Sequence, residues 1–416
     1  MTTREFDIVL YGATGFVGKL TAQYLARTAG SLRVALAGRS AEKVRAIRDG
    51  LGPTAADWGL LEADASAPST LAAMAARTQV VVSTVGPYTT YGLPLVAACA
   101  AAGTDYADLT GETPFIRESI DLYGKQAHDT GARIVHSCGF DSVPSDLGVY
   151  ALYRRVSADG AGELTDTDFV LRSFSGGVSG GTLASMMEFM TSTSADPEVR
   201  RTMDDPYTLT TDRPAEPELG RQTDTPWRRG ADIAPELRGS WTGAFMMGAP
   251  NARIVRRSNA LLDWAYGRRF RYSENMSLGS SALAPLTSAV STAVQVAVMA
   301  LGSRYFNKLP RGILDRIAPK PGTGPSERAR NKGHYRVEVY TRTSAGRRYR
   351  AVVAQQGDPG YLATSVLLGE CALALAVDRE SLSDLRGVLT PAAAMGDVLL
   401  TRLPAAGVML EVESLG

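Results

Sequence analysis

Cysteine and histidine are scarce in this chain, whose 416 residues contain three of each. The cysteines, Cys99, Cys138 and Cys371, are far apart and odd in number, which argues against a disulfide framework and favours a reducing compartment. The histidines are scattered as well, and there is no CxxC motif. We therefore expect no metal site.

The chain also lacks an excess of charge of either sign. It has 44 Lys and Arg against 43 Asp and Glu, a net charge of +1. Such a balance argues against a nucleic-acid partner. The first residues do not resemble a signal peptide, because charged side chains surround an apolar run that begins by Phe6. We therefore expect a cytoplasmic protein.

A glycine-rich turn stands near the N terminus. The apolar run 6–11 leads into Gly12, Gly15 and Gly18, and an amphipathic helical pattern follows. Strand, turn and helix in this order are typical of a dinucleotide site, where the pyrophosphate lies on free N–H groups at the helix start. The alternative is an ordinary tight turn between strand and helix. The residues predicted to bind the cofactor here are Gly12, Ala13, Thr14, Gly15, Phe16 and Val17.

The end of the second apolar run bears on the type of cofactor. Residues 33–37 lead into Gly38, Arg39 and Ser40, where NAD-specific sites carry an acidic residue for the ribose 2′-hydroxyl. Arg39 can instead pair with a 2′-phosphate, and Ser40 adds a hydroxyl donor, so we predict a preference for NADPH. The alternative is that Arg39 is a solvated loop residue, while Ser40 also resembles a helix N-cap. Asp64, after the third run, either accepts a hydrogen bond from the adenine amino group or caps the next helix.

Strand and helix patterns alternate six times between residues 5 and 137. This rhythm predicts an α/β fold, a Rossmann-type doubly wound parallel sheet with helices on both faces. The fourth strand, 79–85, gives the strongest strand signal. Because its carboxyl end faces the nicotinamide in such a sheet, Val85, Gly86 and Pro87 are predicted to complete the cofactor site.

Five motifs occur in order at the junctions of this pattern. They are GATGFVGK (12–19), ALAGRS (35–40), STVGPY (83–88), YADLTGE (106–112) and CGFDSVPSD (138–146). Together they resemble the saccharopine-dehydrogenase-like oxidoreductases, and within them the trans-acting enoyl reductases of phthiocerol and phenolphthiocerol lipid biosynthesis. Segments 249–259 and 387–396 resemble the same subgroup, so the similarity covers nearly the whole chain.

The resemblance implies NADPH-dependent reduction of an α,β-double bond in a polyketide or fatty-acyl thioester. It further implies that an acyl-carrier domain of a polyketide synthase presents the chain. Two other functions stay open, because likeness of fold is a weak warrant for activity. One is an NADP-dependent dehydrogenase of a small amino or imino acid, and the other is a non-catalytic NADP-binding protein on a lipid surface.

The alternation stops near Leu147. Alternating, β-branched stretches at 163–174 and 334–355 predict strands of a mixed sheet. We expect a homodimer built from three parts. These are an NADP-binding Rossmann domain at 1–146, a substrate and dimerisation α+β domain at 147–357, and C-terminal helices at 358–416 that return to the first domain.

Three later stretches carry open interpretations. Residues 275–303 contain no charged side chain and form a buried or substrate-lining helix, a peripheral contact with a lipid surface, or a membrane span. Residues 204–240 predict a long surface loop. A run of arginines either faces a phosphopantetheine phosphate or an acidic carrier domain, or forms a solvated, ion-paired surface. These are Arg253, Arg256, Arg257, Arg268, Arg269 and Arg271.

Candidates for the proton donor lie at the carboxyl ends of strands 4 to 6. Tyr88 is the first choice, because Pro87 fixes the turn just after strand 4. His136 and Asp141 are next, although His136 is alternatively a satisfied core histidine and Asp141 a helix cap. No Tyr-x-x-x-Lys pair follows strand 4, which argues against the short-chain dehydrogenase mechanism. Further candidates are Tyr91, Asp108 and Glu112.

Overall fold

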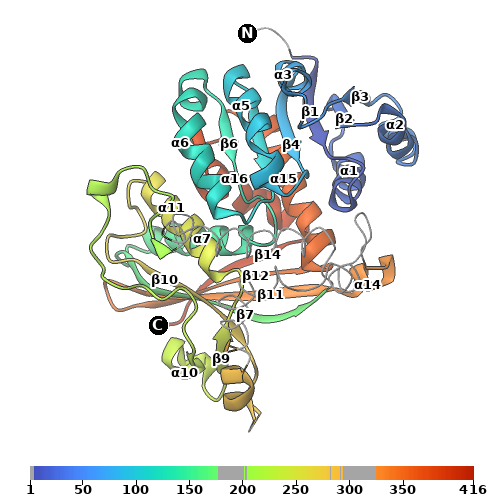
Figure 1. The fold of residues 1–416 in the computed structure, drawn as a ribbon. Coiled ribbons are helices and arrows are strands. Elements are labelled where there is room, and N and C mark those ends of the chain that lie inside the picture. Colours follow the sequence, from blue (N-terminus) through green and yellow to red (C-terminus); the bar gives the residue numbers. More distant parts are fainter. Residues whose placement is uncertain (1–3, 177–200, 202–203, 282, 291, 294–324) are drawn as a thin grey trace, which may run out of the picture.

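The structure, a computed structural model, describes residues 4–176, 201, 204–281, 283–290, 292–293 and 325–416. Two seven-stranded sheets organise these residues. Figure 1 shows the N-terminal sheet, sheet A, above the second sheet, sheet B, with helices packed between them. The candidate site lies where the two layers meet.

Sheet A is parallel and contains the six predicted strands in the order β6-β5-β4-β1-β2-β3, with β13 added beside β6. Apolar runs form the central strands, which are almost completely buried. Strands β2 and β3 are added on one side of β1, and β4, β5 and β6 on the other. The order of strands therefore reverses between β1 and β4, the place where such folds bind dinucleotides. The strands are β1 (Phe6–Tyr11), β2 (Val34–Gly38), β3 (Gly59–Glu62), β4 (Thr78–Ser83), β5 (Asp105–Asp108), β6 (Arg133–Val135) and β13 (Gly387–Leu389).

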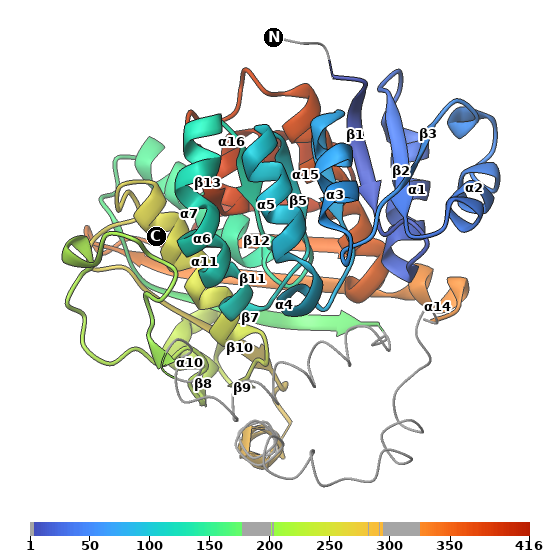
Figure 2. The same cartoon turned by 45° about the horizontal axis from the view of Figure 1, so that its top comes forward.

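Helices cover both faces of sheet A. One face packs against α3 (Pro68–Ala76), α5 (Leu93–Ala102) and α6 (Thr113–Thr130), the helices in front of the sheet in Figure 2. The other face packs against α1 (Phe16–Thr28) and α15 (Thr364–Val377), with α2 (Ala41–Asp49) near the edge. The doubly wound fold is therefore confirmed.

Sheet B is mixed, as predicted. It has the order β14-β12-β11-β7-β10-β9-β8, and only the pair β7 and β10 is parallel. Helix α7 (Val143–Ala158) packs on the face toward sheet A, where a Cβ at Gly148 would lie 3.0 Å from Val339. The strands are β7 (Leu164–Ser175), β8 (Arg228–Arg229), β9 (Trp241–Ala244), β10 (Arg271–Ser277), β11 (His334–Thr343), β12 (Arg348–Gln356) and β14 (Met409–Ser414).

The stretch predicted as a long loop, 204–240, is more structured than expected. It contains the short helices η2 (Arg213–Ala215), α10 (Gly230–Ile233) and η3 (Pro235–Leu237), and β8 pairs with β9 at the edge of sheet B. The loop interpretation was wrong for this part, because Ile233 and Leu237 bury their side chains against Val170 and Tyr340 of sheet B.

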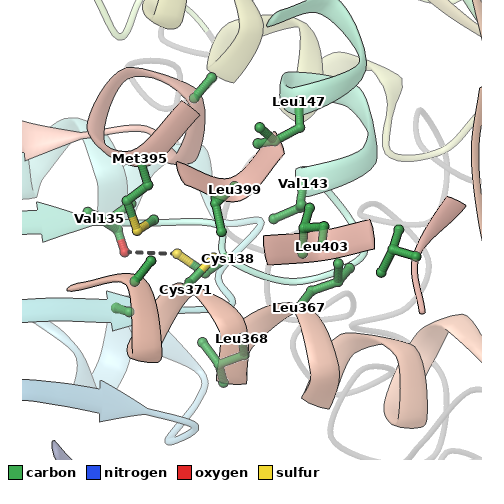
Figure 3. Packing of buried hydrophobic residues seen from close by; sticks show 14 of the residues in the cluster. Val135, Cys138, Val143, Leu147, Leu367, Leu368, Cys371, Met395, Leu399 and Leu403 are labelled. Atoms are coloured by element: carbon green, nitrogen blue, oxygen red, sulfur yellow. Dashed lines mark hydrogen bonds between the residues drawn. The ribbon is translucent and has the colours of Figure 1, made fainter. Parts of the chain in front are cut away.

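The C-terminal segment joins the two layers. Helices α15 and α16 (Pro391–Ala405) lie between the sheets, while β13 extends sheet A and β14 extends sheet B. Figure 3 shows Leu367, Cys371 and Leu399 in the core with Cys138, whose thiol donates to the Val135 carbonyl oxygen at 3.6 Å. All three cysteines are buried and free.

Within the described part of the chain, one helical stretch, Pro359–Val377, is long and apolar enough to cross a membrane. It includes α15, and 78% of its most apolar window is buried inside the protein. The burial makes α15 a core helix, held between α1 and α16.

Candidate active site

The glycine turn forms a cradle at the start of α1. Gly12 has φ +92°, a region that favours glycine. A Cβ there would lie 2.7 Å from both Thr84 Oγ1 and Val85 Cγ2, and a Cβ at Gly18 would overlap the Gly12 carbonyl oxygen. The first turn of α1 has no acidic side chain, and Gly15 offers no side-chain cap. The N–H groups at the helix start are therefore available to an anion, so the cradle fits a pyrophosphate.

Arg39 and Asp64 follow the ends of the neighbouring strands β2 and β3, and the charges of both act on the hydroxyl of Tyr11. Burial raises the pKa of Tyr11; the charge of Asp64 raises it further, and that of Arg39 lowers it. Arg39 is exposed and forms no ion pair with a described carboxylate, which leaves it available to a 2′-phosphate.

Ser40 and Asp64, which were predicted to bind the cofactor together with Arg39, both act as caps. Ser40 is the predicted N-cap of α2, since its Oγ accepts from the Lys43 N–H at 3.4 Å. Asp64 Oδ1 accepts from the Ser66 N–H and hydroxyl, both at 2.9 Å. Asp64 therefore caps the turn before α3, the alternative to a role at the adenine.

Tyr88 is buried after β4, with its hydroxyl turned back toward the end of that strand. Its hydroxyl donates to the Ser83 carbonyl oxygen at 3.0 Å and accepts from the Leu109 N–H at 3.5 Å. The side chain is 4% exposed, and burial raises its pKa well above the ordinary value. The Tyr88 hydroxyl is thus engaged on both sides, which argues against the first choice of proton donor.

His136 is a satisfied core histidine, the alternative that the sequence left open. It follows β6 directly and is 1% exposed. Its Nδ1 lies 2.7 Å from Asp108 Oδ2, and its Nε2 lies 2.9 Å from Ser119 Oγ. The other oxygen of Asp108 accepts from the Ser137 N–H at 3.0 Å. His136 and Asp108 therefore hold the ends of β5 and β6 together.

Asp141 is less buried than Tyr88 and His136. It lies in the loop between β6 and α7, near the carboxyl end of sheet A, and is partly exposed. Burial alone raises the pKa of its carboxyl to about 6. No hydrogen bond of this carboxyl is found within the described part of the chain. Of Tyr88, His136 and Asp141, it is the one whose side chain forms no hydrogen bond within the described residues.

A buried network supports the Asp141 loop from sheet B. Ser142 Oγ donates to Asn251 Oδ1 at 2.9 Å, and Asn251 Nδ2 donates to Glu274 Oε2 at 3.0 Å. Tyr272 donates to the other oxygen of Glu274 at 2.8 Å. Burial raises the pKa of Glu274 to about 8. Sequence reasoning missed Asn251 and Glu274, although Asn251 stands inside the later motif 249–259.

A second connection reaches the Asp141 loop from the C-terminal segment. The Phe140 N–H donates to Thr364 Oγ1 at 3.0 Å, and the Thr364 hydroxyl donates to the Pro359 carbonyl oxygen at 2.8 Å. The same segment contacts the glycine turn, because the rings of Phe16 and Tyr361 are 4.9 Å apart. The candidate site is therefore composite, and sequence spacing gives no sign of these contacts.

The predicted arginine cluster does not face an open phosphate site. Arg253 and Arg256 on α11 (Gly248–Leu261) are buried and form ion pairs with Asp224. Arg257 is buried too and donates to the carbonyl oxygens of Leu209 and Val388. The ion-paired alternative is thus correct for Arg253 and Arg256, whereas Arg257 bonds to backbone carbonyl groups. All three side chains join α11 to its neighbours.

The charge-free stretch 275–303 divides between different environments. Its first residues complete β10, and residues 284–290 are helical, with 294–303 outside the described residues. Leu283, Leu286 and Val290 are 65%, 63% and 53% exposed. Their spacing of three and four places these side chains on one helix face. This described part therefore has an exposed apolar face as well as a buried one, on which Ala284 and Ser288 lie.

A polar cavity of about 300 Å³ lies away from these residues. Asp168, Arg228 and Tyr340 line it, on the face of sheet B opposite α7. Arg228 Nη2 donates to Asp168 Oδ1 at 2.7 Å within it. This cavity is separate from the cradle, so the cradle and the Asp141 loop define the candidate site.

Comparison with known proteins agrees with this geometry. Residues 8–135 match the saccharopine dehydrogenase NADP-binding domain. A trans-acting enoyl reductase of Mycobacterium tuberculosis is 64% identical over 408 residues, covering 98% of this chain and 97% of the relative. That of Mycobacterium ulcerans is 62% identical over 413 residues, covering 99% of each. Saccharopine dehydrogenase (L-Glu forming) of Saccharomyces cerevisiae aligns with a TM-score of 0.53 at 13% identity, over 98% of this chain and 99% of that one.

The cradle, the exposed Arg39 and the matching domain define an NADP-dependent oxidoreductase. A further M. tuberculosis relative, 69% identical over 414 residues, covers 100% of this chain and 99% of its own length. The chain belongs to the trans-acting enoyl reductase family, within the saccharopine-dehydrogenase-like proteins.

Proposed function

We propose that this protein reduces the α,β-double bond of a polyketide or fatty-acyl thioester in complex-lipid biosynthesis. The names of its full-length relatives support the reaction type. The observation that carries the proposal is the Asp141 carboxyl, a partly exposed acid with a pKa of about 6 in the loop between β6 and α7.

The reaction has two requirements beyond binding. NADPH, when bound, supplies a hydride for the β-carbon of the substrate. Negative charge then develops on the thioester oxygen, and the α-carbon must gain a proton. A carboxyl that stays partly protonated near neutral pH is suited to donate this proton. Asp141 is assigned to that step, and the network of Ser142, Asn251 and Glu274 orients its loop.

The test is oxidation of NADPH in the presence of a long-chain trans-2-enoyl thioester of coenzyme A. Wild-type protein is expected to form the saturated thioester, and Asp141→Asn to lose about two to four orders of magnitude in kcat. Asp57→Asn, at an exposed position, is the matched control. Because the acid form is active, kcat/KM should fall as the pH rises above about 6. A wild-type rate in Asp141→Asn would overturn the assignment.

The small-substrate alternative is tested in the same assay. A dehydrogenase of an amino or imino acid would reduce NADP⁺ in the presence of saccharopine or a related amino acid and ignore the enoyl thioester. A non-catalytic protein would bind NADPH and turn over neither substrate. Either result would replace the proposed function.

We further propose that a carrier domain presents the acyl chain near a lipid surface. The support is the exposed apolar face of Leu283, Leu286 and Val290. Co-sedimentation with phosphatidylglycerol vesicles is expected for the wild type and should be reduced by Leu286→Glu. Thr287→Glu, at the neighbouring position of the same helix, is the control. Equal sedimentation of all three proteins would contradict the lipid contact.

A further inference from the structure

The glycine turn has no cationic side chain of its own. Residues 12–18 supply glycine, alanine, threonine, phenylalanine and valine only. Backbone N–H groups and the helix dipole favour an anion at the start of α1, but a pyrophosphate carries two negative charges in this position. A cation from elsewhere in the fold would complete such a site.

The second domain places a cation next to this turn. Helix α14 (Glu327–Lys332) carries Arg330, whose guanidinium carbon lies 5.2 Å from the ring centroid of Phe16. Phe16 is the first residue of α1, directly after Gly15. Contact with this ring brings the Arg330 guanidinium to the end of the helix that binds the anion.

Arg330 is anchored by its backbone and is only partly committed through its side chain. Its carbonyl oxygen accepts from the Asp358 N–H at 2.9 Å, and its Nη1 donates to the Pro325 carbonyl oxygen at 2.6 Å. The side chain is half-buried. Within the described residues, no carboxylate forms an ion pair with it.

Asp358 is the acidic group that faces Arg330 most directly. Burial raises the pKa of Asp358, and the charge of Arg330 opposes that rise. Asp358 Oδ1 is occupied as the cap of the following helix, because it accepts from the Leu362 N–H at 3.2 Å. Within the described residues only Nη1 of the Arg330 guanidinium has a hydrogen-bond partner, so its other N–H donors are available to a ligand.

We propose that Arg330 binds the cofactor pyrophosphate from the second domain. Guanidinium is suited to this role, because its planar fork donates two parallel hydrogen bonds to phosphate oxygens. Arg330 and Arg39 then act on different phosphates. Arg39 distinguishes NADPH from NADH, whereas Arg330 contributes equally to both, since the two cofactors share the pyrophosphate.

Direct binding of NADPH and of NADH, measured by fluorescence titration without substrate, tests this assignment. Arg330→Ala should weaken both cofactors by roughly tenfold to a hundredfold. Arg330→Met, which keeps an apolar contact with Phe16, should lose as much as Arg330→Ala, and Arg330→Lys should retain most of the affinity. Arg328→Ala, at an exposed position of the same helix, should bind as the wild type does.

Three results would overturn the proposal. Wild-type affinity in Arg330→Met would make the contact one of packing alone. A loss confined to NADPH would place Arg330 at the 2′-phosphate. An equal loss in Arg328→Ala would point to general electrostatics of α14. These outcomes do not depend on the acyl substrate, so they are independent of the test of enoyl reduction.

Discussion

Phe16 and Tyr361 meet edge to face, with ring centroids 4.9 Å apart and planes at 84°. Phe16 opens α1 after the glycine turn, and Tyr361 belongs to the π-helical segment Pro359–Ala363 before α15. The cofactor cradle and the C-terminal segment therefore share one packing contact. Folding of the last part of the chain is needed to complete the site at its beginning.

Tyr361→Ala tests this dependence. The side chain is fully buried, so its removal should lower the free energy of unfolding by about 3–5 kcal/mol. NADPH affinity should fall as well, because Phe16 loses its support. Tyr361→Phe keeps the ring and should bind NADPH as the wild type does. Urea unfolding and fluorescence titration measure the two effects, and full affinity in folded Tyr361→Ala would separate the cradle from the segment.

Arg39→Ala is expected to change cofactor preference. Loss of a charged hydrogen bond to the 2′-phosphate should weaken NADPH more than about tenfold, while NADH affinity should stay nearly constant. Isothermal titration with both cofactors checks the difference. Arg45→Ala, at an exposed position on α2, is the control. Equal weakening of NADPH and NADH would refute the 2′-phosphate assignment.

Two glycines of the turn should respond differently to substitution. A Cβ at Gly15 would lie 3.2 Å from the Gly12 carbonyl oxygen, a contact that a small shift relieves, whereas a Cβ at Gly18 would overlap that oxygen. Gly15→Val should therefore fold and lose NADPH binding through collision with the pyrophosphate. Gly18→Ala should lower the melting temperature even without cofactor. Thermal unfolding with and without NADPH separates these cases, and cofactor binding by Gly15→Val would contradict the cradle.

Glu274 makes stability depend on pH. Its pKa is raised from an ordinary 4.5 to about 8 by burial, so between these values the folded protein holds a proton that the unfolded chain has released. Stability from this group is therefore present at low pH and falls as the pH rises, by up to about 1.4 kcal/mol per pH unit.

Glu274→Gln should remove this pH-dependent contribution to the free energy of unfolding. The free energy of unfolding of the variant, relative to the wild type, should increase between pH 5 and about 8. Asp146, with a pKa of about 7, titrates in both proteins and cancels in the comparison. Urea unfolding at several pH values provides the measurement. If the free energies of unfolding of the wild type and the variant changed with pH in parallel, Glu274 would be ionised in the folded state.

The sequence was informative wherever a local pattern determines the structure. The apolar runs of β1, β2 and β4 and the three glycines after β1 predicted sheet A and its cradle, because burial and backbone freedom leave a direct trace in residue type. Strand β13 has no such sequence pattern and was not predicted. It has three residues, Gly387–Leu389, and becomes a strand only by pairing with β6.

At the candidate site, the sequence could not predict the direction in which side chains point. The position of Tyr88 after β4 was correct, but its hydroxyl turns back to Ser83, a choice that tertiary packing makes. The contacts of Asn251 with Ser142 and of Arg330 with Phe16 join residues distant in sequence. Such contacts follow from the packing of the two sheets, which no periodicity encodes.

The proposed reaction transfers hydride from NADPH to the β-carbon of an enoyl thioester. Its most direct test uses NADPH deuterated at the transferable C4 position, a long-chain trans-2-enoyl thioester of coenzyme A, and mass spectrometry of the product. We expect a saturated thioester with one deuterium at the β-carbon from the wild type, and almost none from Asp141→Asn. An unchanged enoyl thioester, or deuterium elsewhere in the product, would contradict it.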